Sequence, residues 1–350
     1  MDKYLIILLL LSVFSCAERE SEKEHGTEAK ELESMGVRNA HMMTYDPNDS
    51  TIYCFGGADH EKVLSDLWRL DASEWVKVDT DKEPPARTFG SIAYQKNEKR
   101  ILLFGGSKVL FGEELTIDNL LNDTWQFKNG QWEKMDCSTS PGPRAEAAMV
   151  YDEVNKEIVL FGGYTIENGN IIKLGDTWVF KENNWELRST DGPTERHGVS
   201  LAYDSNNRQV ILFGGSTIDR QYGNGKGETW LWTNRQWQQL PTNEIHGLFN
   251  PTSAYHPYLR SIILFGGWNG QEREDKMFSY SDRRWKEMLP NSRPKARNHG
   301  QMIYDEKNNR LVLFGGHDGK EVFGDTWVFV NEDWKLLSEL QPMSRVDNGH

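Results

Sequence analysis

The chain has few cysteines and no long apolar segment, and both shortages limit what it can be. Three cysteines stand among 350 residues, and no cysteine and histidine spacing of the zinc type occurs. We therefore expect free Cys54 and Cys137, no disulfide framework, no metal site and no cofactor. The main apolar segment, residues 4–14, is interrupted only by Ser12 and is too short to span a bilayer.

Positive charge is also in short supply. The formal net charge is −13, and no basic stripe is visible along the sequence. This argues against a nucleic-acid partner, although an anionic small ligand could still bind a locally positive pocket. Phosphate-binding loops, nucleophile elbows and His-Glu-x-x-His motifs are absent as well, so no common hydrolase is indicated.

The N-terminus has the pattern of an export signal. A short start with one lysine and the apolar segment lead to Ser15 and Cys16, and residues 13–16 resemble a relaxed lipobox, with Phe14 departing from the strict pattern. We predict a signal peptide over residues 1–15, lipidation of Cys16, a disordered acidic tether over residues 16–35, and anchoring in a bacterial cell envelope. Plain secretion with an incidental cysteine is the alternative.

One tripeptide, Phe-Gly-Gly, recurs six times through the rest of the chain. Its copies are separated by 49, 57, 52, 52 and 49 residues, and begin at Phe55, Phe104, Phe161, Phe213, Phe265 and Phe314. A second regularity accompanies it, because in each unit an aromatic residue is followed seven positions later by tryptophan, as in Trp178 and Trp185. Only Trp232 and Trp268 fall outside this pairing. Such a period is typical of propeller blades, which cannot bury their faces alone.

Each unit has room for four short strands. In the third unit these are expected near residues 144–151, 157–161, 177–180 and 185–187, with glycine, asparagine and aspartate between them. The sequence therefore predicts an all-β, six-bladed propeller of four antiparallel strands per blade over residues 36–340, followed by a tail over residues 341–350. Because the first blade has its own first strand, we expect six blades and not seven.

The order of arginine, Tyr-Asp, Leu-Phe-Gly-Gly, Asp-Thr-Trp and a closing tryptophan resembles the kelch repeat, in its bacterial form related to the central domain of galactose oxidase. The resemblance covers nearly the whole mature chain and implies the propeller fold. A copper oxidase is not favoured, because that chemistry would require a cross-linked tyrosine and cysteine with paired histidines.

Arginine recurs at the start of the first strand, seven residues before a tyrosine. It occupies five units, as Arg38, Arg87, Arg144, Arg196 and Arg297, and Leu248 replaces it in the fifth. An acid also recurs near the third-strand aromatic, at Asp66, Asp123, Asp176, Glu228, Asp275 and Asp325. One interpretation is a lattice in which each arginine pairs with a carboxylate of the next blade. The other is that Arg87, Arg144, Arg196 and Arg297 converge on the channel mouth and bind an anionic ligand.

Residues that break the repeat are better candidates for a site. Two positions after the arginine, only Glu146 and His299 are ionisable, so they are the candidate catalytic pair if the protein is an enzyme. His197, Trp268 and His317 are expected nearby and are the further candidate ligand-binding residues. All lie at the end of the propeller where the loops after Gly-Gly differ most, and unlike loops on a rigid scaffold commonly carry binding.

Two functions remain open. The first is a monomeric, envelope-anchored propeller that binds a glycan or a protein without catalysis. The second is suggested by resemblance to the six-bladed kelch mutarotase that epimerises sialic acid, in which arginine binds the carboxylate and a glutamate or histidine transfers the proton. No residue set matches that enzyme one to one.

Overall fold

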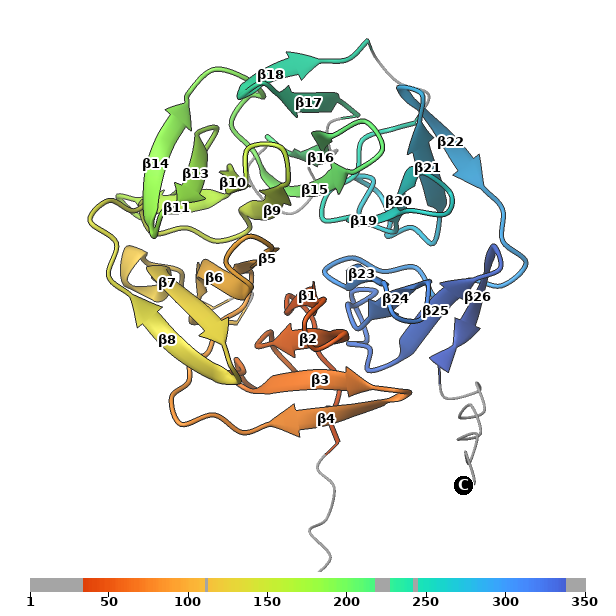
Figure 1. The fold of residues 1–350 in the computed structure, drawn as a ribbon, viewed down its shortest axis with the longest axis horizontal. Helices are drawn as coiled ribbons and strands as arrows, with labels where there is room; N and C mark the ends of the chain where they lie inside the picture. The colour runs from red at the N-terminus through yellow and green to blue at the C-terminus, as the bar shows by residue number, and fades with distance from the viewer. Residues whose placement is uncertain (1–33, 111–112, 218–226, 242–244, 338–350) are drawn as a thin grey trace, which may run out of the picture. The chain divides into compact units, whose positions relative to one another are not determined.

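Six four-stranded antiparallel sheets stand around a central axis in the computed structural model (Figure 1). The structure describes residues 34–110, 113–217, 227–241 and 245–337. Each sheet is built from consecutive segments of the chain, so the predicted propeller of six blades is confirmed. The predicted signal peptide, Cys16 and the tail over residues 341–350 lie outside the described residues.

The blades contain the following strands, from the axis outward. Blade 1 has β1 (Met42–Asp46), β2 (Thr51–Phe55), β3 (Leu67–Asp71) and β4 (Glu74–Val78); blade 2 has β5 (Ser91–Gln95), β6 (Arg100–Ser107), β7 (Leu120–Lys128) and β8 (Gln131–Met135); blade 3 has β9 (Ala148–Asp152), β10 (Glu157–Phe161), β13 (Thr177–Lys181) and β14 (Asn184–Ser189). Blade 4 has β15 (His197–Asp204), β16 (Gln209–Ser216), β17 (Thr229–Thr233) and β18 (Gln236–Gln239); blade 5 has β19 (Thr252–His256), β20 (Ser261–Phe265), β21 (Met277–Ser281) and β22 (Arg284–Met288); blade 6 has β23 (Gln301–Asp305), β24 (Arg310–Phe314), β25 (Thr326–Val330) and β26 (Asp333–Leu336). A hairpin of β11 (Tyr164–Glu167) and β12 (Asn170–Lys173) and a 3-10 turn, η1 (Ile117–Asn119), are additions to blades 3 and 2.

The repeated aromatic residues form the joints between blades. The phenylalanine of every Phe-Gly-Gly packs against the fourth-strand tryptophan of the next blade, with ring centroids 4.9 to 5.6 Å apart. The pair Phe314 and Trp75 makes the same contact between blade 6 and blade 1. Because large aromatic rings remove much apolar area from water, these six contacts explain why both residues recur in every blade.

The two glycines of the tripeptide allow close approach to the next blade. The second glycine donates its N–H to the carbonyl at the arginine position of the following blade, as Gly57 does to Arg87 at 2.9 Å. At the first glycine, Gly56, a Cβ would lie only 2.7 Å from the same Arg87 carbonyl oxygen, and the backbone is left-handed there. Any larger residue would therefore force the two blades apart.

The fourth-strand tryptophans also make a polar contact with the preceding blade. An indole N–H is donated to a threonine in the preceding blade's third strand, at 2.8 to 3.0 Å, by Trp75, Trp185, Trp237 and Trp285. Leu67 and Met277 stand at that position in blades 1 and 5, and the facing Trp132 and Trp334 have buried indole nitrogens with no partner among the described residues. The tryptophan contact is thus both polar and apolar at four joints and apolar at two.

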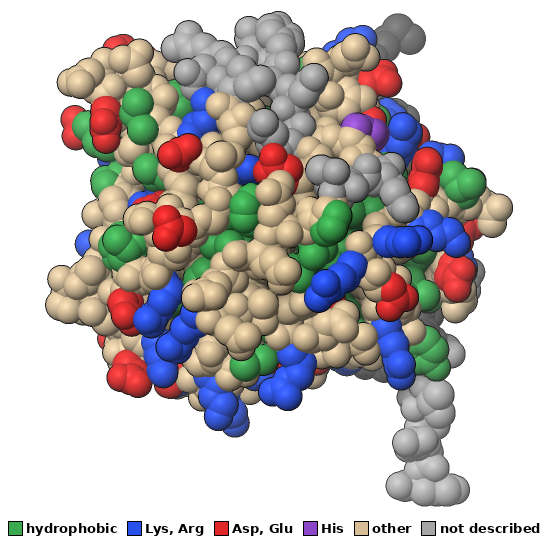
Figure 2. All heavy atoms as spheres, turned by 90° about the horizontal axis from the view of Figure 1, so that it is seen from above, with side chains coloured by type: hydrophobic (Ala, Val, Ile, Leu, Met, Phe, Trp, Pro, Cys, Tyr) green, Lys and Arg blue, Asp and Glu red, His purple; other side chains and the backbone are tan. Residues whose placement is uncertain are grey.

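Cys54 and Cys137 are free, as predicted: Cys54 is buried in β2 and Cys137 follows β8. Acidic and basic side chains are interspersed on the side of the molecule shown in Figure 2. Within the described ranges, no helix is long and apolar enough to cross a membrane.

Candidate functional site

One end of the channel collects the start of every first strand and the loops that follow Gly-Gly. Short antiparallel bridges join the two segments in each of five blades, for example Ala145 with Tyr164 and Asn298 with His317. We name this end the loop face, and the opposite end, where the first strand turns into the second, the turn face. The predicted neighbourhood of the arginines and the variable loops is therefore confirmed.

The recurring arginines are buried inside this face. Their exposed fractions are 0–3%, and each guanidinium bonds an acid and the first Gly carbonyl of its own blade. Arg144, for example, donates to Asp176 through Nη1 at 2.7 Å and through Nη2 at 2.9 Å. The prediction of pairing was right, but the carboxylate belongs to the same blade and not to the next one, because the third strand of a blade begins at the same end as its first strand. We name these five residues, Arg38, Arg87, Arg144, Arg196 and Arg297, the arginine ring.

A tryptophan completes each of these pairs. Trp178 donates its indole N–H to Asp176 at 2.6 Å, and equivalent bonds occur in blades 1, 2, 4 and 6. Burial alone would raise the pKa of Asp176, but the hydrogen bonds and charge of Arg144, with the Trp178 N–H, outweigh it and lower the pKa. These guanidinium groups are therefore committed to structural partners and do not converge on the channel mouth.

Blade 5 replaces all three members together. Leu248 replaces the arginine, Phe278 the tryptophan and Lys276 the acid. The Lys276 position is identified by its backbone, since the Lys276 carbonyl accepts the Gly266 N–H just as the Asp176 carbonyl accepts that of Gly162. The assignment of Asp275 to the acid position was wrong by one residue; Asp275 lies 3.6 Å from Arg293 instead. The joint loss shows that the arginine, the acid and the tryptophan act as one structural unit.

Two residues beyond the arginine, the first strands form a second ring at the mouth of the channel. We name it the mouth ring, and its members are Ala40, Phe89, Glu146, Gly198, Asn250 and His299. All six have left-handed backbones, with φ between 52° and 64°. Within the described chain, five of them donate the backbone N–H to the carbonyl of the preceding member at 2.9 to 3.2 Å. The backbone is therefore uniform while the side chains differ completely.

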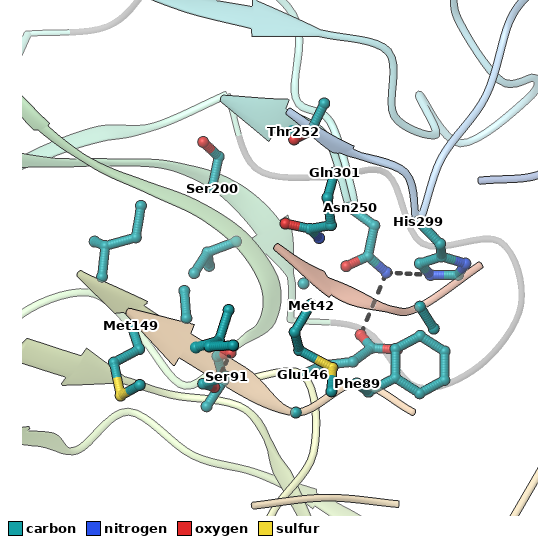
Figure 3. Close-up of a pocket in the computed structure, with 18 of the residues that line it drawn as sticks. Met42, Phe89, Ser91, Glu146, Met149, Ser200, Asn250, Thr252, His299 and Gln301 are labelled. Carbon is teal, nitrogen blue, oxygen red and sulfur yellow. Dashed lines mark hydrogen bonds between the residues drawn. The ribbon is translucent and has the colours of Figure 1, made fainter. Parts of the chain in front are cut away.

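A cavity of about 140 Å³ occupies the channel and is lined by this ring and the residues that follow it. Figure 3 shows Asn250 between Glu146 and His299 on one side of this cavity, with Phe89 beside Glu146. Small polar side chains, among them Ser91 and Ser200, line it farther from these groups. The ionisable groups are thus gathered on one side of the mouth.

Hydrogen bonds join these groups into what we name the polar network: Glu146, His197, Asn250, His299 and His317. Glu146 Oε2 accepts from His197 Nδ1 at 2.7 Å and from Asn250 Nδ2 at 3.3 Å. Asn250 Nδ2 also lies 2.6 Å from His299 Nε2, and His299 Nδ1 lies 2.9 Å from His317 Nε2. Four of the candidate residues named from the sequence therefore share one network.

The two linked histidines are held in their neutral form. Burial, the neighbouring His317 and the charge of Arg273 lower the pKa of His299 well below its ordinary value. Burial and Arg273 also lower the pKa of His317, to about 4. The outer nitrogen of His299 faces the amide N–H of Asn250, and the outer nitrogen of His317 faces the backbone N–H of Gly319. At neutral pH both imidazoles are therefore uncharged and already bonded within the protein.

Aromatic side chains surround the network. Phe89 meets the ring of His299 edge to face at 5.0 Å, and Phe249 and Tyr164 meet that of His197 at 4.9 and 5.4 Å. Burial and the nearby Glu146 raise the pKa of Tyr164. The site thus combines a carboxylate, an amide and neutral imidazoles with apolar walls, the composition of a pocket for a small polar ligand.

The two tryptophans outside the repeat have separate fates. Trp232 is fully buried between blades 3 and 4, in a core that includes Val159 and Val210, and takes the place filled by Phe180 in blade 3. Trp268 lies on the loop face, where its backbone pairs with that of Phe249. Trp268 reaches the neighbourhood of the network but makes no side-chain hydrogen bond to it among the described residues.

Sequence reasoning missed three residues of this site. Asn250 was visible as a mouth-ring member but is not ionisable, Tyr164 lies in an added hairpin, and Arg273 sits in a short loop. Comparison of the loops would have revealed Arg273, since valine stands at the equivalent bridge in blades 1 and 6. His41, the other histidine near the mouth, is buried with both ring nitrogens unpartnered in the described structure, and burial and Arg38 lower its pKa to about 3.

Comparisons with known proteins agree with the repeat. The chain matches the family described as KLHDC2/KLHL20/DRC7 Kelch-repeats domain over residues 12–186 and again over residues 153–346. Mei4-dependent protein 6 of Schizosaccharomyces pombe is 24% identical over 212 residues, which are 55% of this chain and 30% of that protein. Kelch domain-containing protein 10 of Rattus norvegicus is 25% identical over 229 residues, 62% of this chain and 54% of that protein. The chain thus spans about a third to a half of these curated relatives.

A solved structure, that of YjhT, is similar in fold. It aligns with a TM-score of 0.65 over 87% of this chain and 98% of that chain, at 13% sequence identity. At this identity the likeness concerns the propeller alone.

Proposed function

The chain belongs to the kelch-repeat family, and we propose that it binds a carbohydrate at the loop-face mouth of its channel. The propeller of this family is a scaffold for many functions, so the function has to be argued from the site. The polar network supports this proposal. The Glu146 carboxylate and the Asn250 amide line the cavity and suit sugar hydroxyl groups, and Phe89, which also lines it, suits the apolar face of a sugar ring.

Direct binding measurements test the proposal. Neutral and acidic mono- and disaccharides are titrated into the protein, with calorimetry and saturation-transfer NMR as readouts. We expect at least one sugar to bind, and Glu146→Gln and Asn250→Ala to weaken it at least ten-fold. Tyr151→Phe on the turn face is the matched control and leaves affinity unchanged. Unchanged affinity in both network variants would refute the site, and affinity for proteins but for no sugar would refute the ligand class.

Mutarotation is the second candidate function. It is favoured by one observation: two groups that can accept a proton, Glu146 and the neutral His299, meet on the same amide, so either could take the proton of an anomeric hydroxyl and return it to the ring oxygen. Opening of a pyranose requires that the anomeric hydroxyl lose its proton while the ring oxygen gains one. Polarimetry of freshly dissolved acidic and neutral sugars tests this. If a sugar that binds mutarotates at its uncatalysed rate, the protein binds that sugar without catalysing the reaction.

Display on a bacterial cell envelope is the remaining part of the proposal, and it rests on the sequence. The apolar segment over residues 4–14 followed by Cys16 suits a lipidated anchor. We expect the wild-type protein in the membrane fraction and Cys16→Ser in the soluble fraction. A variant that stays as firmly membrane-bound as wild type would refute lipid anchoring.

A further inference from the structure

Three blades carry the same short loop after Gly-Gly, and only one of them carries an arginine in it. The loops bridge Ala58 with Val63 in blade 1, Trp268 with Arg273 in blade 5, and His317 with Val322 in blade 6. In each, the residue after the first bridge position accepts a backbone N–H bond within the loop and closes the same turn. Since the loop folds with valine in two blades, Arg273 is not required by the turn itself.

The guanidinium of Arg273 is held in place by three neighbours. It lies over the indole of Trp268 at 5.3 Å, and its Nε donates to Asn298 Oδ1 at 2.9 Å. It also packs against Gly319, where a Cβ would collide with the guanidinium. Asn298 precedes His299, and the Gly319 N–H donates to His317 Nδ1 at 3.1 Å, so Arg273 borders the polar network.

The arginine has no carboxylate partner in the described structure. Every member of the arginine ring forms an ion pair with an acidic side chain, and Arg235 and Arg310 form ion pairs with Glu157 and Asp305, respectively. Arg273 makes no ion pair within the described residues, and its only side-chain bond there uses Nε, which leaves Nη1 and Nη2. Asp318, whose charge acts on Arg273, uses Oδ1 to accept the backbone N–H groups of Lys320 and Glu321. A partly buried positive charge has thus been placed without a counter-ion.

We propose that Arg273, stacked on Trp268, is an anion subsite that binds a carboxylate or phosphate group of the ligand through Nη1 and Nη2. The planar fork suits two oxygens of one anion, and its partial burial strengthens the bond. This deepens the proposed function, because the polar body of the same ligand would then lie on the polar network. The anionic ligand expected from the sequence is thereby assigned to Arg273 in place of the arginine ring.

Simple anions test the subsite without knowledge of the ligand. Acetate and inorganic phosphate are titrated separately into the uniformly ¹⁵N-labelled protein, and the Trp268 indole resonance, assigned with Trp268→Phe, is followed. We expect saturable shifts in wild type, at least ten-fold weaker binding in Arg273→Met, and partial recovery in Arg273→Lys. The anion that binds more tightly identifies the group. Gly319→Ala should weaken binding because its Cβ displaces the guanidinium.

The outcomes separate this inference from the proposed function. No saturable shift with either anion in folded wild-type protein, or equal binding in Arg273→Met, overturns the anion subsite whatever the sugar experiments show. Conversely, a neutral sugar that binds wild type and Arg273→Met equally well, but not Glu146→Gln, supports the proposed function alone. The control for a change in loop packing is Val322→Met, at the equivalent position in the loop of blade 6.

Discussion

Two rings of side chains lie two residues apart where the chain enters the first strand of each blade, and they differ in what is repeated from blade to blade. The arginine ring repeats one chemical unit in five blades, and blade 5 loses all three members of that unit together. The mouth ring repeats only its backbone, with a left-handed residue in every blade, while its side chains run from glycine to histidine. Repetition at a fixed position therefore indicates packing here, and variation on a fixed backbone indicates the candidate site.

The largest effect is expected in the arginine ring. Arg144→Ala leaves the Asp176 carboxylate without its counter-ion and should cost about 3 kcal/mol or more of unfolding free energy, because one partner of a buried pair remains. Urea denaturation measures it. The triple change R144L/D176K/W178F copies blade 5 and should recover most of the loss. If the triple variant is less stable than Arg144→Ala, the three residues do not act as one unit.

The buried histidines and the acids of the arginine ring should affect the unfolding free energy in different pH ranges. His41, His299 and His317 have pKa values below that of a free histidine. As the pH falls, these histidines therefore take up protons in the unfolded chain at a higher pH than in the folded protein. Unfolding free energy should therefore fall from pH 6.5 downward, by up to about 1.4 kcal/mol per pH unit for each histidine, until pH nears about 4 for His317. His317→Asn should flatten this fall.

The arginine ring should respond only at lower pH. The carboxylates of Asp66, Asp123, Asp176 and Asp325 have lowered pKa values, so their contribution is present above the ordinary aspartate pKa and is lost as pH falls through the folded value. Denaturation curves between pH 7 and 3 measure both ranges. A stability that is constant from pH 7 to pH 4.5 would contradict the neutral histidines.

Glu146→Gln should change binding and not folding. The substitution keeps the shape of the side chain but removes the charge, so sugar affinity should fall at least ten-fold while unfolding free energy changes by less than about 1 kcal/mol. Calorimetry and urea denaturation of the same preparation test this. Destabilisation comparable with that of Arg144→Ala would place Glu146 among the structural residues.

The blade joints offer a smaller, purely structural effect. Thr124→Val removes the acceptor of the Trp185 indole N–H and makes this joint resemble that of Leu67 and Trp132, at a cost of about 1 to 2 kcal/mol. Sugar binding should not change. A loss below the error of the measurement would show that the threonine hydroxyl adds nothing to the aromatic contact.

The sequence predicted the fold well because its signal was repeated six times. The spacing of Phe-Gly-Gly and of the paired aromatics specifies contacts that every blade makes with the next, so each copy supports the others. Glu146 and His299 were found for the opposite reason, as departures from the repeat. The partner of each arginine was misassigned because sequence order does not reveal whether the third strand's acid faces its own blade or the next.

Asn250 and Arg273 show where reading the sequence fell short. Asn250 matters because it lies between two ionisable side chains from other blades, and that adjacency exists only once the ring has closed. Arg273 becomes conspicuous only when its loop is superposed on those of blades 1 and 6, which requires the shared β-bridge.

The blade joints also differ in the length of chain that each must close. The tryptophan-to-threonine bonds between successive blades join residues 56 to 61 apart, whereas the bond from Trp75 to Thr326 joins residues 251 apart. Loop-closure entropy makes this last joint about 1.2 kcal/mol more expensive than its neighbours before any contact forms. We therefore expect the blades to assemble in order along the chain and the joint between blade 6 and blade 1 to form last. Until it forms, the mouth ring lacks the bond from Ala40 to His299, so the site is completed only by the final step of folding.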